Sequence, residues 1–217
     1  MDVRPTLVMI AGPNGSGKST LTDWLMADGV GFGEYINADA IEKSQTGRDR
    51  RTRSLRAQAV ATDRRTRCMA ERRDFSFETV MSHPSKVELL RTARALGFEA
   101  VVFFVATASP DINVRRVRER VAAGGHDVEE RAIRERYKRT LSHLYGAVRA
   151  ADRSVVFDNT GESATGGPGR PLRPVAEVHS DGTRAAIVRR ASDLPEWTLA
   201  ALIGPIEADL ALLDAEA

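Results

Sequence analysis

Gly12-Pro13-Asn14-Gly15-Ser16-Gly17-Lys18-Ser19 is the stretch of this 217-residue sequence that decides the fold. It matches the pattern G-x-x-x-x-G-K-[ST] in full, and it lies between an apolar run, 6–11, and a segment with apolar residues at helical spacing, 19–26. A glycine-rich turn between a buried strand and a helix lets backbone N–H groups converge on phosphate oxygens. The sequence therefore predicts a phosphate-binding loop, or P-loop, with ATP as its ligand.

Two positions of this loop have specific expected roles. Lys18 places a cation on the β- and γ-phosphates, and Ser19 is expected to ligate Mg²⁺. The residues expected to contact ATP are Gly12, Pro13, Asn14, Gly15, Ser16, Gly17, Lys18, Ser19 and Thr20. The alternative is an accidental glycine-rich turn, which the complete pattern in its strand-to-helix context disfavours.

Strand and helix patterns alternate along the rest of the chain. Helical periodicity covers 85–96, 111–122 and 128–150, and one or two surface helices are expected within 43–73. Further strands are expected at 35–39, 74–80, 99–106 and 154–159. This alternation predicts an α/β fold with a doubly wound parallel sheet and flanking helices, which together with the P-loop is of the P-loop NTPase or kinase type.

The chain is expected to divide into a core and an appendage. Residues 1–160 form the predicted P-loop kinase core, and the Gly- and Pro-rich residues 161–173 predict a flexible linker or loop. Residues 174–217 predict an appendage packed on the core, with a β-hairpin around Asp181-Gly182 and a terminal helix over 199–213.

Composition limits the partners and the compartment. The 32 basic and 30 acidic residues leave a net charge of +2, so a nucleic-acid partner is disfavoured. The Arg-rich segment 48–73 still motivates a polynucleotide kinase as an alternative, although no aromatic residue lies between Tyr35 and Phe75 to stack on bases. A single cysteine, Cys68, and the lack of a long apolar run predict a cytoplasmic protein with no membrane partner.

Two carboxylates follow predicted strands, where side chains of a parallel sheet reach the active-site crevice. Asp39 can accept a proton from an acceptor hydroxyl or serve as an N-cap of the following helix, and spacing favours neither role. Glu78, followed by Thr79, is either a solvated edge charge or part of a substrate-binding crevice. Arginines on both sides of Gly124-Gly125-His126 are typical of a phosphate-clamping lid, although most of them should lie on solvated helix faces.

Taken in order, the motifs resemble the zeta-toxin family of P-loop kinases, in its small stand-alone branch, over about residues 6–160. They are the P-loop, Ile36-Asn37-Ala38-Asp39, Phe75-Ser76-Phe77-Glu78-Thr79, Gly124-Gly125-His126-Asp127-Val128, Arg136-Tyr137 and Phe157-Asp158-Asn159. The combination is more specific than the P-loop alone.

The resemblance implies roles for individual residues. It makes Asp39 the general base and places Glu78 and Thr79 on the substrate side. It assigns Arg120 and Arg136 to the ATP phosphates, with Arg118 and Arg134 as close alternatives, so the implied catalytic set is Asp39, Lys18, Arg120 and Arg136. Asp158 and Asn159 are expected near the adenine, with Asn159 contacting ATP and a structural role for Asp158 equally open.

The function implied by the resemblance is an ATP-dependent small-molecule kinase that uses Mg²⁺. It would transfer the γ-phosphate to a hydroxyl of a nucleotide-sugar resembling UDP-N-acetylglucosamine, or of a related metabolite, and an antitoxin protein is a further expected partner. The alternatives are a polynucleotide or nucleoside kinase, and a toxin-like ATP-binding protein that docks an antitoxin.

Overall fold

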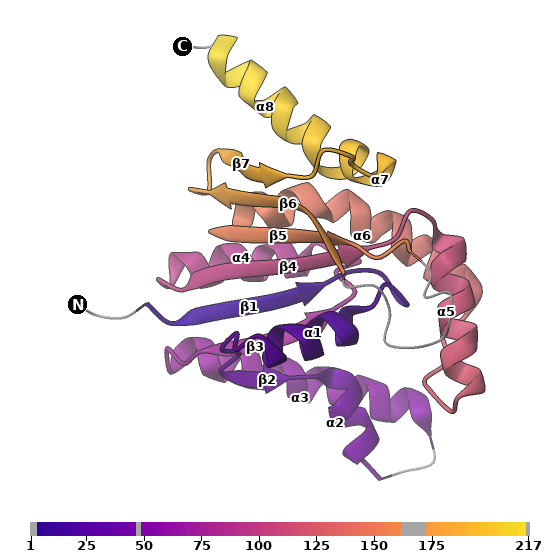
Figure 1. Cartoon of the computed structure of the whole chain (residues 1–217). Helices are drawn as coiled ribbons and strands as arrows, with labels where there is room; N and C mark the ends of the chain where they lie inside the picture. The colour runs from indigo at the N-terminus through magenta and orange to yellow at the C-terminus, as the bar shows by residue number, and fades with distance from the viewer. Residues whose placement is uncertain (1–3, 47–48, 162–171, 216–217) are drawn as a thin grey trace.

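A seven-stranded, mostly parallel sheet forms the centre of the protein, seen here in a computed structural model that describes residues 4–46, 49–161 and 172–215 (Figure 1). The strand order is β2-β3-β1-β4-β5-β6-β7; the five strands from β2 to β5 in this order are parallel, whereas β6 pairs antiparallel with both β5 and β7. The strands are β1 (Thr6–Ala11), β2 (Glu34–Ile36), β3 (Phe75–Thr79), β4 (Glu99–Ala106), β5 (Arg153–Asp158), β6 (Arg173–Ser180) and β7 (Ala185–Arg190). The predicted α/β fold class is confirmed.

The apolar run of β1 is continuous because both of its faces are buried. Leu7 and Met9 enter one hydrophobic cluster, whereas Val8 and Ile10 enter a second cluster on the other face of the sheet. Hydrogen bonds to β3 on one edge and β4 on the other complete the burial. A central parallel strand covered on both faces has this unbroken hydrophobic composition.

Helices pack on both faces of the sheet. α1 packs against β1 and β4 on one face, and α3, α4 and α6 lie behind the sheet in Figure 1, with α5 beyond the carboxyl ends of the strands. The helices of the core are α1 (Lys18–Ala27), α2 (Ala38–Ser44), α3 (Arg50–Ala70), α4 (Ser85–Ala95), α5 (Pro110–Ala122) and α6 (Glu130–Ala150). The carboxyl ends of the strands are the edge where ligands bind in open α/β sheets.

The C-terminal segment extends the sheet and then leaves it. β6 pairs antiparallel with β5, and Gly182 has a φ of 99° in the turn that leads to β7. The chain continues through α7 (Glu196–Thr198), a π-helical turn (Leu199–Ile203) and α8 (Gly204–Ala215), which projects from the body in Figure 1. Of the predicted linker 161–173, residues 162–171 lie outside the described residues, and the division into core and appendage stays a prediction.

The end of β2 differs from the predicted strand boundary. The strand expected over 35–39 ends at Ile36, because the Asn37 side chain accepts hydrogen bonds from the backbone N–H groups of Asp39 and Ala40 and starts α2. Asn37, not Asp39, is therefore the N-cap.

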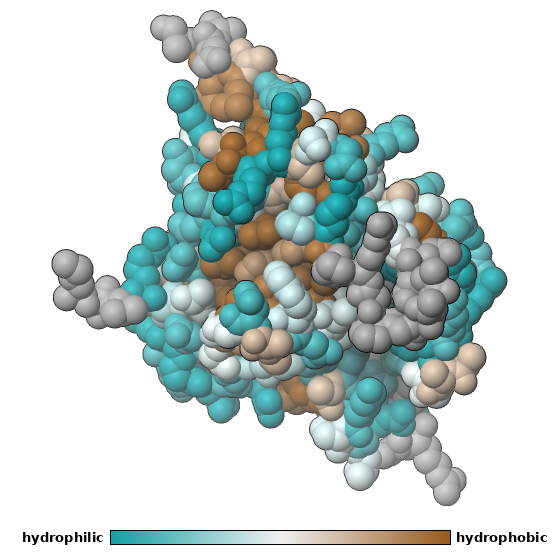
Figure 2. All heavy atoms as spheres, in the orientation of Figure 1, coloured by the Kyte–Doolittle hydropathy of each residue, from teal (hydrophilic) through white to brown (hydrophobic). Residues whose placement is uncertain are grey.

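Part of one sheet face carries exposed apolar side chains. Figure 2 shows them as brown atoms beside α1, on the face toward the viewer. Trp24 of α1 is 47% exposed and meets Phe157 of β5 edge-on, and Val188 of β7 is 58% exposed. α1 covers the part of this face formed by β1 and β4.

Candidate active site

Three glycines give the P-loop a backbone path that other residues cannot follow. Gly12, Gly15 and Gly17 have φ angles of 154°, 73° and 99°. A Cβ on Gly12 would lie 2.1 Å from the Val105 carbonyl oxygen. The loop is therefore a narrow turn whose N–H groups are free of side-chain obstruction, as a phosphate cradle requires.

Two asparagines from distant elements hold this loop in place. Asn159, directly after β5, donates from Nδ2 to the Ser16 carbonyl at 2.8 Å. Asn113, buried on α5, donates to the Asn14 carbonyl. In the loop itself, the Ser16 hydroxyl and the Asn14 side-chain oxygen are buried without a hydrogen-bond partner among the described residues, and Asn14 lines the cavity, so its side-chain oxygen is left for a ligand.

Lys18 lies at the centre of the site, half-buried at the start of α1. Its ammonium donates to the carbonyls of Gly12 and Pro13, both at 2.9 Å. Burial lowers the pKa of Lys18 to about 8, although the carboxylates of Glu78 and Asp39 oppose that shift. A lysine with this pKa is mostly charged at neutral pH, and it keeps its charge at alkaline pH only where an anionic ligand raises the pKa again.

Glu78 faces the P-loop helix, not solvent. Its carboxylate accepts hydrogen bonds from the hydroxyls of Ser19 at 3.3 Å, Thr22 at 2.8 Å and Tyr35 at 2.6 Å. Desolvation and the neighbouring Glu78 carboxylate raise the pKa of Tyr35, so its hydroxyl remains a donor. The interpretation of Glu78 as a solvated charge at the edge of the sheet is therefore wrong. Its carboxylate is instead held beside the hydroxyl of Ser19, the residue expected to bind Mg²⁺.

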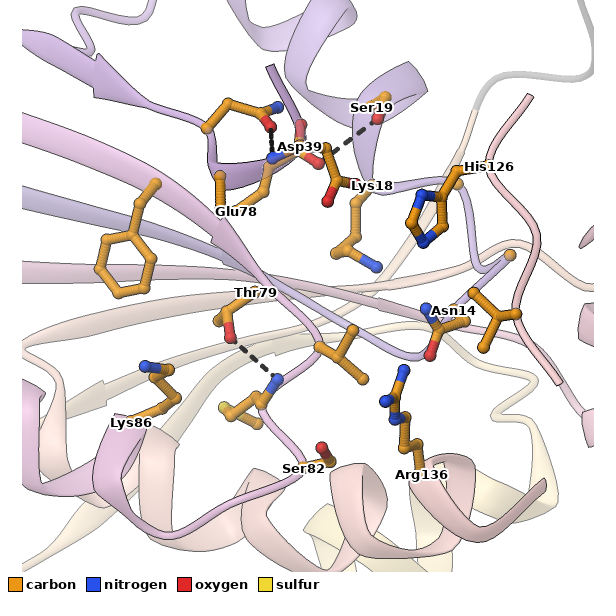
Figure 3. Close-up of a pocket in the computed structure, with 18 of the residues that line it drawn as sticks. Asn14, Lys18, Ser19, Asp39, Glu78, Thr79, Ser82, Lys86, His126 and Arg136 are labelled. Atoms are coloured by element: carbon orange, nitrogen blue, oxygen red, sulfur yellow. Dashed lines mark hydrogen bonds between the residues drawn. The ribbon is translucent and has the colours of Figure 1, made fainter. Parts of the chain in front are cut away.

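Asp39 projects from the first turn of α2 into the same cavity as Lys18 (Figure 3). Its side chain is exposed and has no hydrogen-bond or ion-pair partner among the described residues. Asn37 fixes the turn: its Oδ1 accepts from the Asp39 N–H, and its Nδ2 donates to Tyr35 at 3.0 Å. One asparagine thus joins the Asp39 turn to the Glu78 network.

Thr79 has a structural contact at this strand end. Its carbonyl accepts from the Gly12 N–H at 3.2 Å, and its hydroxyl accepts from the Met81 N–H at 3.0 Å. Met81 is buried with a φ of 55°, which is uncommon for a residue with a side chain. The Thr79 hydroxyl thus supports an unusual turn in the cavity wall.

The two lid arginines preferred from the sequence line the cavity, and their two alternatives do not. Arg120 donates to the His126 carbonyl at 2.6 Å and so closes the turn between α5 and α6, while Arg136 points from α6 toward Asn14 in Figure 3. Arg118 and Arg134 instead form ion pairs with Glu130 outside it.

The pair Asp158-Asn159 has contacts that favour structural roles. Asn159 borders the cavity, but its amide is engaged with the P-loop backbone. Asp158 accepts hydrogen bonds from Trp197 Nε1 at 3.0 Å and from Thr160. These contacts agree with a structural role for Asp158, which was one of its two expected roles.

The cavity has a volume of about 660 Å³ and includes residues that the sequence reasoning missed. Arg116 of α5 and Lys86 of α4 line it, as do three residues of α3: Ser54, Gln58 and Arg65. The 4- and 7-residue spacing within α3 was the available signal, since it places the three on one helix face. The arginine content of the segment indicated a surface helix instead.

These residues fit ATP with Mg²⁺ better than a metal held by protein alone. Within the described ranges, no three His, Cys, Asp or Glu side chains gather as a metal site. Mg²⁺ is commonly held by one or two carboxylates together with phosphate oxygens, and Ser19, Glu78 and Asp39 supply such donors on one wall of the cavity.

The chain can be compared with known proteins by its sequence and by its fold. Among the described residues, no helix is both long and apolar enough to cross a bilayer. The chain is 28% identical over 130 residues to an uncharacterized protein of Haemophilus influenzae, which covers 60% of this chain and 91% of that protein.

Solved structures share the fold at low identity. A chain of the AvrRxo1-ORF1:-ORF2 complex with ATP matches with a TM-score of 0.63 and 15% identity, over 86% of this chain and 61% of that one. The PezAT toxin-antitoxin system of Streptococcus pneumoniae matches with a TM-score of 0.53 and 14% identity, over 72% of this chain and 68% of that one. This chain thus spans about three fifths of the AvrRxo1 chain.

A family model described as an AAA domain matches residues 7–144. That range runs from β1 through the P-loop, β3 and most of α6, and so contains the cavity walls described above apart from Asn159. The chain belongs to the AAA domain family, with the fold of a P-loop kinase.

Proposed function

We propose that this protein is an ATP-dependent phosphotransferase that phosphorylates a hydroxyl of a small molecule. One observation carries the proposal: the unpaired carboxylate of Asp39 and the P-loop lysine, Lys18, open into one cavity. Transfer to an alcohol uses a group beside the γ-phosphate that accepts the hydroxyl proton, and the Asp39 carboxylate can be that group.

The chemistry follows from this arrangement. The P-loop and Lys18 hold the ATP phosphates, and Asp39 takes the proton of the acceptor hydroxyl as its oxygen bonds to the γ-phosphorus. The bond from that phosphorus to the β–γ bridging oxygen breaks, and ADP leaves. Arg120 and Arg136 neutralise charge on the transferred group. Mg²⁺, when bound through Ser19, supplies further charge neutralisation, and Glu78 fixes the Ser19 hydroxyl by hydrogen bonding.

The more specific proposal is a zeta-toxin-like kinase of a nucleotide-sugar resembling UDP-N-acetylglucosamine. The order of the sequence motifs along the chain supports this proposal. The PezAT toxin-antitoxin structure also supports it, although the likeness to that structure is one of fold alone. An antitoxin partner belongs to the same proposal.

The test is ADP formation with Mg²⁺ and a panel of UDP-sugars, nucleosides and nucleotides. Asp39→Asn should bind ATP like the wild type but lose at least about a hundredfold in kcat, the scale of a general base. Asp63→Asn is the matched control, because Asp63 is exposed on α3 and does not line the cavity. Full turnover by Asp39→Asn would refute the proposed base.

A further inference from the structure

A second pair of cations lines the cavity apart from the phosphate-binding arginines. Arg65 extends from α3 and Lys86 from the start of α4. In Figure 3, Lys86 lies on the other side of Thr79 from Lys18 and Arg136. The cavity therefore has a cationic region that the P-loop does not account for.

Both side chains are withdrawn from solvent without a negative partner. Arg65 is only 7% exposed, and its guanidinium lies 5.0 Å from the centre of the Phe77 ring and donates to the Thr62 hydroxyl at 2.9 Å. Lys86 is half-buried. In the part of the chain that the structure describes, neither cation pairs with a carboxylate.

The electrostatics of this pair are unfavourable in the protein by itself. Burial lowers the pKa of Arg65, and burial followed by repulsion from Arg65 lowers the pKa of Lys86. Contact with the Phe77 ring compensates Arg65 in part, whereas Lys86 has no aromatic contact of this kind within residues 4–46, 49–161 and 172–215. Two like charges at a cavity wall, one buried and one half-buried, cost stability unless an anion joins them.

ATP is not the expected anion here, because its phosphates are placed by the P-loop at Lys18. We infer that Arg65 and Lys86 bind an anionic group of the acceptor, so that the substrate is an alcohol that also carries a phosphate or a carboxylate. The polar face formed by Ser54 and Gln58 continues this subsite along α3. The inference deepens the proposed function, since it presupposes an acceptor in this cavity.

The test separates this subsite from the ATP site. With the protein saturated by the non-hydrolysable analogue AMP-PNP and Mg²⁺, binding of pyrophosphate, acetate and neutral glycerol is measured by calorimetry and by the shift in Tm. Wild type should bind pyrophosphate or acetate but not glycerol, and the anion that binds identifies the group. Arg65→Met and Lys86→Met should each weaken that binding about tenfold or more, the scale of one charge-assisted hydrogen bond.

Two controls make the result specific. Arg67→Met and Lys138→Met remove exposed cations of α3 and α6 that do not line the cavity, and they should leave anion binding unchanged. AMP-PNP affinity should stay at the wild-type value in all four variants, which also shows that they fold.

The outcomes are distinct. Equal anion binding by wild type, Arg65→Met and Lys86→Met overturns the inference, as does wild-type protein that binds none of the anions. If anion binding depends on both cations while no acceptor is phosphorylated, the subsite stands and the proposed phosphotransfer fails.

Discussion

The carboxylate of Glu78 accepts a hydrogen bond from the Ser19 hydroxyl at 3.3 Å, across the gap between β3 and the start of α1. Since β3 is the hydrogen-bonded neighbour of β1, the sheet itself places this acid beside the P-loop. Glu78 therefore positions the residue expected to bind Mg²⁺ and adds negative charge that attracts the ion.

Replacing Glu78 should impair Mg²⁺-dependent turnover more than folding. Glu78→Gln keeps the shape and can still accept a hydrogen bond, but it removes the charge. We expect kcat to fall about a hundredfold, with a higher Mg²⁺ concentration needed for half-maximal rate. The measurement is ADP formation in a Mg²⁺ titration, with the exposed Glu99→Gln as control; unchanged Mg²⁺ dependence would count against this role.

ATP binding should weaken above pH 8. Burial lowers the pKa of Lys18 to about 8, so the lysine of the free protein loses its proton as the pH rises through that value. ATP prefers the charged form, hence kcat/KM for ATP should be constant below pH 7 and fall about tenfold per pH unit well above pH 8. Lys18→Arg stays charged and should remove this alkaline decline, so a decline that persists in Lys18→Arg assigns it to another group.

Asn159 should act as a brace of the P-loop and not as a contact to adenine. Asn159→Asp cannot donate to the Ser16 carbonyl, and we expect it to lower the free energy of unfolding by about 1 kcal/mol. Affinity should drop equally for ATP and for inorganic tripolyphosphate, which has no base. Loss of ATP affinity alone, measured by calorimetry, would instead indicate an adenine contact.

One glycine offers a gain in stability. Gly146 lies inside α6, and a Cβ there would meet Val87 at 3.7 Å, an ordinary van der Waals distance. Gly146→Ala should raise the free energy of unfolding by about 0.5–1 kcal/mol, because alanine loses less backbone entropy in a helix. Urea denaturation measures the change, and a decrease in stability would reveal crowding at the α4–α6 contact.

Sequence patterns predicted the elements whose formation depends on residues that are close together in the chain. The P-loop, its flanking strand and helix, and the strand over 99–106 are local patterns of apolar spacing and glycine, and the structure has them at almost the same residues. The choice of Arg120 and Arg136 came from a resemblance of motifs. Only the fold shows that Arg118, two residues from Arg120 and so on another helix face, pairs with Glu130.

Contacts between segments that are far apart in the chain could not be predicted from the sequence. Nothing local to Glu78 indicates that three hydroxyls from α1 and β2 surround its carboxylate. Arg65 was not predicted for a different reason: it lies in a segment rich in arginines, most of which face solvent, so composition gave no sign that this side chain turns inward.

The hydrogen bond from Asn159 to Ser16 joins residues 143 positions apart, and this has a consequence for synthesis of the chain. A P-loop made early on the ribosome receives its brace only after β5 has emerged and docked beside β4. Long-range closure of this kind is slow relative to helix formation. ATP affinity should therefore arise late in folding, and a nascent chain that stops before residue 153 should not retain the nucleotide.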